Sequence, residues 1–71
     1  MLRRERAVKA PAGVLRAWRA RGHGDGWRGR PSCAELARER HGEAAARAYL
    51  AGWRSGARDR ARHDAQGVSA A

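Results

Sequence analysis

A chain of 71 residues is long enough for one small domain, which buries only about 60% of the surface that its unfolded chain exposes. Lys and Arg outnumber Asp and Glu 16 to 7, and the net charge of +9 indicates a polyanionic partner such as nucleic acid. No stretch approaches the about 20 apolar residues of a membrane span, and residues 1–10 lack the apolar core of a secretion signal. Cys33 has no second cysteine to pair with, so a cytoplasmic protein is expected.

The expected organisation is a helical domain over residues 11–61 between a flexible basic tail, 1–10, and a flexible C-terminal tail, 62–71. A first helix is expected to begin near Pro11, because proline suits the first turn of a helix. Its apolar stripe continues at helical spacing into glycines, in the order Leu15, Trp18, Gly22, Gly26 and Gly29.

The glycine-rich segment 22–29 permits two interpretations. Each glycine inside a helix costs about 1 kcal/mol relative to alanine, so helix propensity alone favours a loop that begins after Arg21. The helical spacing of the glycines indicates instead that the helix continues through them, with a smooth face for close packing.

The middle of the chain predicts a short helix over residues 34–41. Ser32 and Glu35 have the spacing of a capping box, in which the two side chains bond to backbone N–H groups at the start of a helix. Gly42 is a candidate C-cap, although a continuous helix through it is the alternative. The second main helix is then expected to start at Glu43 or Ala44 and to run to about Ala61.

The second main helix carries a broad apolar face. Next to this face runs a track of mostly small residues, which comprises Ala45, Tyr49, Gly52 and Gly56. Glycine tracks on both helices would let the two backbones approach closely. Four large side chains would then cover the contact from its margins, namely Trp18, Trp27, Tyr49 and Trp53. We therefore expect an all-α fold in which two main helices pack as a hairpin through glycine-rich faces, with the linker helix between them and disordered termini.

Three kinds of chemical site find little support in the sequence. The glycine segment lacks the Gly-Lys-Ser or Gly-Lys-Thr end of a phosphate-binding loop, since the only lysine is Lys9. Metal sites usually draw on closely spaced ligand pairs, and Cys33 and the three histidines form none. A cysteine nucleophile would need a pocket that two or three short helices rarely enclose. No catalytic residue, metal or cofactor is therefore expected.

Arginines concentrate in two segments. The first cluster comprises Arg16, Arg19, Arg21, Arg28 and Arg30, and the second comprises Arg47, Arg54, Arg58, Arg60 and Arg62. Such density is typical of proteins that hold RNA phosphates and stack arginine on unpaired bases. Trp18 and Trp53 are expected in the core, whereas Trp27 lies off the glycine track and is the candidate for a half-exposed position.

Two blocks of the sequence together resemble the ribosome modulation factor family. Residues 21–30, Arg-Gly-His-Gly-Asp-Gly-Trp-Arg-Gly-Arg, are similar to the family's Arg-Gly-aromatic-x-x-Gly-x-x-Gly-Arg segment. Residues 49–54, Tyr-Leu-Ala-Gly-Trp-Arg, followed by Asp59 and Arg60, are similar to its second block. The resemblance implies that the glycine segment is helical. His23 in place of tyrosine, and Ala34-Glu35 in place of Pro-Tyr, depart from the family pattern.

The resemblance implies a bacterial, stress-related protein that binds small-subunit ribosomal RNA, hinders translation and favours hibernating ribosomes, without a small-molecule substrate. The RNA-binding candidates are Arg21, Arg30, Arg54 and Arg60, on both charge and motif, and Arg28 and Arg58, on charge alone. The expected helix-packing residues are Trp18, Gly22, Gly26, Gly29, Tyr49, Gly52 and Trp53. The alternatives are an ATP-dependent drug-modifying enzyme of the same fold family and a nonspecific nucleic-acid-binding protein. The oligomeric state and the role of Cys33 stay open.

Overall fold

The computed structural model describes the backbone of residues 11–70 and the side chains of residues 11–67. It contains the helices α2 (Ala12–Trp27), α3 (Ala34–His41) and α4 (Glu43–Ala70), and no strand in this part of the chain. The expected all-α class is confirmed, as is the short linker helix. None of the helices in the described part is long and apolar enough to cross a bilayer. The predicted tail 1–10 lies outside the described residues.

Helix α2 continues through Gly22, Gly24 and Gly26 and ends at Trp27, so the loop favoured by helix propensity was the wrong interpretation. Tertiary packing overrides propensity here, because Gly22 and Gly26 are buried against α4. Gly29, expected in the packing face, instead lies beyond the helix at φ 71° and has an exposed surface. It ends α2 in a conformation that side chains with a Cβ rarely adopt.

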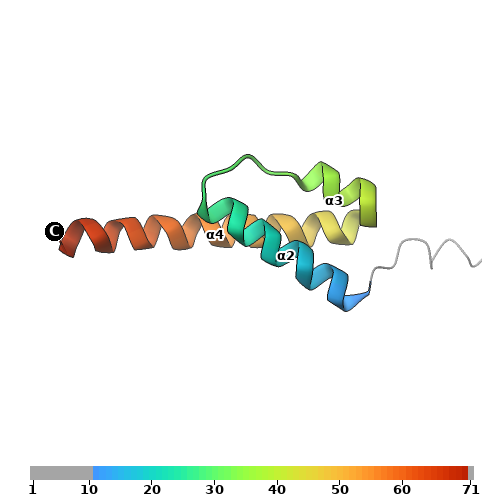
Figure 1. Cartoon of the computed structure of the whole chain (residues 1–71), viewed down its shortest axis with the longest axis horizontal. Helices are drawn as coiled ribbons and strands as arrows, with labels where there is room; N and C mark the ends of the chain where they lie inside the picture. The colour runs from blue at the N-terminus through green and yellow to red at the C-terminus, as the bar shows by residue number, and fades with distance from the viewer. Residues whose placement is uncertain (1–10, 71) are drawn as a thin grey trace, which may run out of the picture.

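The expected packing of the two main helices through their glycine faces is confirmed. The helices run parallel, however, whereas the expected hairpin would place them antiparallel. Gly22 lies against the backbone of Tyr49 and Gly26 against that of Trp53, four residues further on in both helices. Gly52 and Gly56 meet the backbone of Arg19 and His23 in the same order. The linker and α3 carry the chain back along α4, which makes the parallel arrangement possible (Figure 1).

The core lies where all three helices meet. Trp18 from α2, Ala37 from α3, and Ala45 and Tyr49 from α4 form the buried cluster, with Trp53 packed against it. Tyr49 is fully buried, and its hydroxyl donates a hydrogen bond of 2.5 Å to Asp25 Oδ2. Trp18 donates from Nε1 to His41 Nδ1 at 2.9 Å, which fixes the end of α3 to α2. Both main-helix aromatics therefore bury their rings while satisfying their polar atoms.

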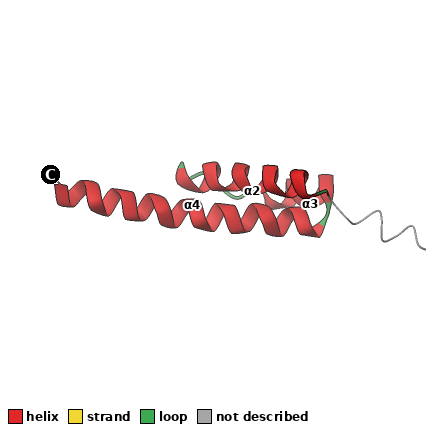
Figure 2. Cartoon of the chain, turned by 90° about the horizontal axis from the view of Figure 1, so that it is seen from below, coloured by secondary structure: helices red, strands yellow, loops and turns green. Residues whose placement is uncertain are grey.

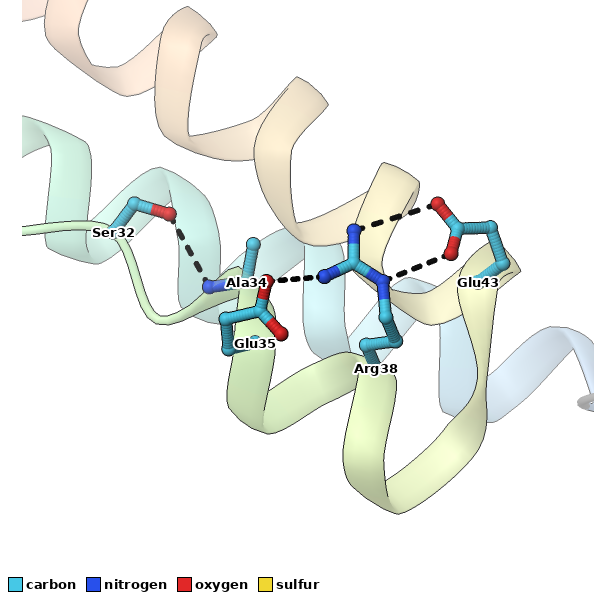
Figure 3. A network of polar contacts seen from close by, with 5 residues as sticks. All are labelled: Ser32, Ala34, Glu35, Arg38 and Glu43. Atoms are coloured by element: carbon cyan, nitrogen blue, oxygen red, sulfur yellow. Dashed lines mark hydrogen bonds and ion pairs between the residues drawn. The ribbon is translucent and has the colours of Figure 1, made fainter.

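Helix α3 is held by polar contacts that differ from the expected capping box (Figure 3). The helix begins at Ala34, whose N–H donates to Ser32 Oγ at 3.2 Å, while Glu35 pairs with Arg38 rather than reaching back to the chain. Arg38 also donates from Nε to Glu43 at 2.9 Å, and this hydrogen bond lowers the pKa of Glu43. Arg38 thus ties α3 to the first turn of α4 across the turn at Gly42, whose φ is 89°.

Helix α4 does not end near Ala61 but continues to Ala70, so residues 62–70, expected as a tail, are helical. The ion pair between Arg60 and Asp64, 3.0 Å long at spacing i,i+4, supports the extension. Helices α2 and α3 lie on one side of α4, and the C-terminal part of α4 extends beyond them (Figure 2).

The glycine contact generates a stability prediction. A Cβ added at Gly52 would overlap the carbonyl of Arg19, and backbone cannot move aside as a flexible side chain can. We expect Gly52→Ala to lower the free energy of unfolding by about 1–3 kcal/mol or more. For a domain of this size, each kcal/mol lowers Tm by about 4–8 °C. Thermal melting followed by circular dichroism measures the change.

Gly67→Ala is the matched control in the same helix, because nothing lies within 4 Å of the Cβ it would add. This substitution should stabilise α4 by up to about 1 kcal/mol. Equal melting temperatures for the two variants would contradict the close packing of α2 and α4.

Candidate nucleic-acid interface

Most acidic groups in the described chain already have partners, whereas most arginines do not. Asp25 accepts from Tyr49, Glu35 and Glu43 pair with Arg38, and Asp64 pairs with Arg60. Asp59 accepts from His23 at 3.1 Å and lies 3.8 Å from Arg62. Among residues 11–67, the arginines without a carboxylate partner are Arg16, Arg19, Arg21, Arg28, Arg30, Arg40, Arg47, Arg54 and Arg58. These side chains are exposed to solvent, and Arg47 lies near enough to Glu43 to contribute, after Arg38, to the lowered pKa of that carboxyl.

The outer face of α4 carries the most regular part of this charge. Arg54 and Arg58 each follow a buried glycine of the packing track by two residues, a rotation of about 200° around the helix. Because Gly52 and Gly56 face α2, both arginines point away from it, and their side chains are exposed. Arg47 precedes Arg54 by seven residues, two full turns, and lies on the same face. We call Arg47, Arg54 and Arg58 the outer arginine row.

Two other predicted RNA-binding residues also have internal roles at the end of α2. Arg28 donates from Nη1 to the carbonyl of Gly24 at 3.2 Å, and Arg60 donates from Nη1 to the carbonyl of Trp27 at 3.0 Å. The last carbonyls of a helix lack partners within the helix and carry partial negative charge, which these cations offset. Sequence reasoning assigned both arginines on charge or motif and did not foresee this contact between α2 and α4.

The two remaining candidates lie near tryptophans. The Arg21 guanidinium lies over the ring of Trp18, with Cζ 5.3 Å from the ring centroid. Arg30 is exposed, but its backbone is fixed, since its N–H donates to Asp25 O at 2.9 Å and its carbonyl accepts from Trp53 Nε1 at 2.9 Å. The structure therefore places the six predicted arginines on different faces of the molecule and does not gather them into one site.

Trp27 is half-buried in an aromatic cluster that the sequence did not reveal. Its ring stacks with His23 at a centroid distance of 6.5 Å, and it lies 5.3 Å from the ring of His63. His63 was assigned to a tail, so only its spacing of seven residues from Gly56 could have placed it on the α2 side of α4. The half-exposed position expected for Trp27 is the one that the structure shows.

The described surface offers shallow depressions rather than an enclosed pocket. Three of them have volumes of about 360, 330 and 280 Å³ and lie along the edges of the contacts between helices. Residues 11–70 contain no group of three His, Cys, Asp or Glu side chains placed to hold a metal ion. The glycine segment is helical as far as Trp27, with Gly22 and Gly26 covered by α4, so its backbone does not form a phosphate-binding loop.

Comparisons of the chain with protein-family models, with curated proteins and with solved structures found no match.

The buried phenol of Tyr49 generates a pH prediction. Burial, together with the hydrogen bond to Asp25, raises the pKa of Tyr49 well above its ordinary value. The unfolded chain ionises its tyrosine near pH 10, whereas the folded chain keeps the phenol protonated. Stability from this group is therefore complete below about pH 10 and is lost as the pH rises above it, because unfolding then releases a proton.

Tyr49 is the only tyrosine, so the ultraviolet absorbance of tyrosinate reports on it alone. We expect the native chain to titrate well above its denatured form. Tyr49→Phe should remove this alkaline component and lower the stability at neutral pH by about 1.5–3 kcal/mol, since Asp25 loses a donor. Native absorbance that titrates together with that of the denatured chain would contradict the buried hydrogen bond.

Proposed function

We propose that this chain is an RNA-binding protein that acts on the ribosome, contacts small-subunit ribosomal RNA and favours inactive ribosomes. The single observation that carries the RNA-binding part is the outer arginine row of α4. Three exposed arginines on one helix face, none of them in an ion pair among the described residues, form a surface suited to a phosphate backbone.

The ribosomal part of the proposal rests on the two sequence blocks that resemble ribosome modulation factor. In the structure, residues 21–30 form the glycine face and the end of α2, and residues 49–54 form the part of α4 that packs on this face. The two blocks therefore pack against each other in one structural unit. This contact supports the proposal that the resemblance reflects a shared fold.

Binding by the outer arginine row predicts a defined salt dependence. Arg54→Gln combined with Arg58→Gln should reduce the slope of log affinity against log salt concentration for single-stranded RNA by about 1.4, which is about 0.7 for each lost phosphate contact. This corresponds to a loss of roughly 25-fold in affinity at about 0.1 M salt. Arg16→Gln combined with Arg40→Gln removes the same charge at exposed, unpaired arginines outside the row and should change binding less. Equal losses for the two pairs would show that only net charge matters.

Co-sedimentation with ribosomes in sucrose gradients at near-physiological salt tests the biological target. The wild-type chain should bind the small subunit or the whole ribosome saturably, and the variant altered at Arg54 and Arg58 should bind less. An excess of duplex DNA should not displace the wild-type chain. Complete displacement by duplex DNA would favour a nonspecific nucleic-acid-binding protein instead.

A further inference from the structure

The depression of about 360 Å³ lies where the end of α2 meets α4. One part of its wall is formed by residues 26–29, and the other by Ala57, Arg60, Ala61 and Asp64 of α4. Four of the lining residues are glycine or alanine, which leaves room between the larger side chains. Gly29 turns the chain away at φ 71°, and nothing lies within 4 Å of the position where a Cβ would stand. The depression is therefore open on the side of this turn.

Arg60 is held in one orientation at this depression. Its Nη1 donates to Trp27 O at 3.0 Å, and its Nε donates to Asp64 Oδ1 at 3.0 Å and Oδ2 at 3.2 Å. Its Cζ lies 5.8 Å from the centroid of the Trp27 ring, and 46% of its side chain is exposed. Trp27 in turn packs against the rings of His23 and His63. The result is a planar cation, fixed on an aromatic ring and partly open to solvent.

These features suit a nucleobase better than a phosphate. A guanidinium plane is a stacking surface for unpaired bases, and a side chain that is already restrained loses less conformational entropy on binding. A phosphate would compete with Asp64 for Arg60 and would be repelled by the carboxylate. Carboxylate oxygens have unused acceptor capacity for the N–H groups of a base. Arg28, which also lines the depression, is exposed and without an acidic partner among the described residues, so it can meet a flanking phosphate.

We propose that this depression binds one unpaired base of single-stranded RNA, stacked on Arg60 with its N–H edge toward Asp64. This proposal rests on the RNA-binding function proposed above. It adds a site for a base, whereas the outer arginine row provides contacts for phosphates only. The row would hold phosphates irrespective of sequence, and the depression would require a strand whose bases are free.

Arg60→Lys tests stacking separately from charge, because lysine keeps the charge and loses the planar group. Arg40→Lys, at an exposed position of α3 outside the outer arginine row, is the matched control. Affinities are measured for a labelled unstructured RNA of about ten nucleotides and for inorganic polyphosphate, which has phosphates without bases. We expect Arg60→Lys to weaken RNA binding by about 5- to 150-fold, the range for one stacked base. Its polyphosphate affinity and salt slope should stay unchanged, and Arg40→Lys should leave both ligands' affinities unchanged.

Because Arg60 also caps α2, a second pair of variants avoids any loss of stability. Ala61→Leu fills the depression from an exposed helical position, and Ala20→Leu does the same in the depression of about 330 Å³ on another edge of the helix pair. Leucine is a good helix former, so both variants should fold, as melting curves will show. Only Ala61→Leu should weaken RNA binding, by about 5-fold or more.

Equal effects of Arg60→Lys and Arg40→Lys, or undiminished RNA binding by a folded Ala61→Leu variant, would overturn the base site. Sedimentation with ribosomes separates this failure from that of the proposed function. If the wild-type chain binds ribosomes and the depression variants bind equally well, the base site is wrong and the proposed function stands. If the wild-type chain does not bind ribosomes but its RNA affinity still depends on Arg60 and Ala61, the base site stands alone.

Discussion

The close approach of α2 and α4 is the contact on which the rest of the structure depends. The two backbones touch at Gly22 and Gly26 of α2 and at Gly52 and Gly56 of α4. A Cβ at any of these positions would overlap the backbone of the other helix. A chain with only 13 large apolar residues besides its 17 alanines cannot fill a wide space between helices. Close contact between small residues supplies dispersion energy without large side chains and keeps the required core small.

This packing also determines which polar groups are used internally. With the helices so close, Tyr49 reaches Asp25 on α2, and Arg60 reaches the last carbonyl of α2. The buried phenol and the helix end thereby gain partners that no local stretch of sequence could provide. The same contact fixes the rotation of α4, so that Arg54 and Arg58 face outward.

The arginines therefore fall into two groups with different physical roles. Those of the outer arginine row are exposed, lack acidic partners within the described chain and suit a phosphate backbone in the proposed ribosomal complex. Arg60 and Arg28 lie at the end of α2, where each makes a hydrogen bond to a backbone carbonyl and lines the same depression. In the proposed complex, phosphate contacts are separate from the base contact, and the protein distinguishes free strands from duplex because only a free strand offers an unstacked base.

The sequence by itself determined the all-α class, the start of α2, the short helix α3 and the glycine faces that pack, because helical spacing and turn residues are local signals. Helix propensity misplaced the end of α2, and charge alone could not show that Arg28 and Arg60 bind carbonyls. Only the tertiary structure decided that the main helices run parallel, that Gly29 ends a helix instead of packing, and that Trp27 meets His63. These features depend on which residues distant in sequence come together, and that is set by the backbone contact between α2 and α4.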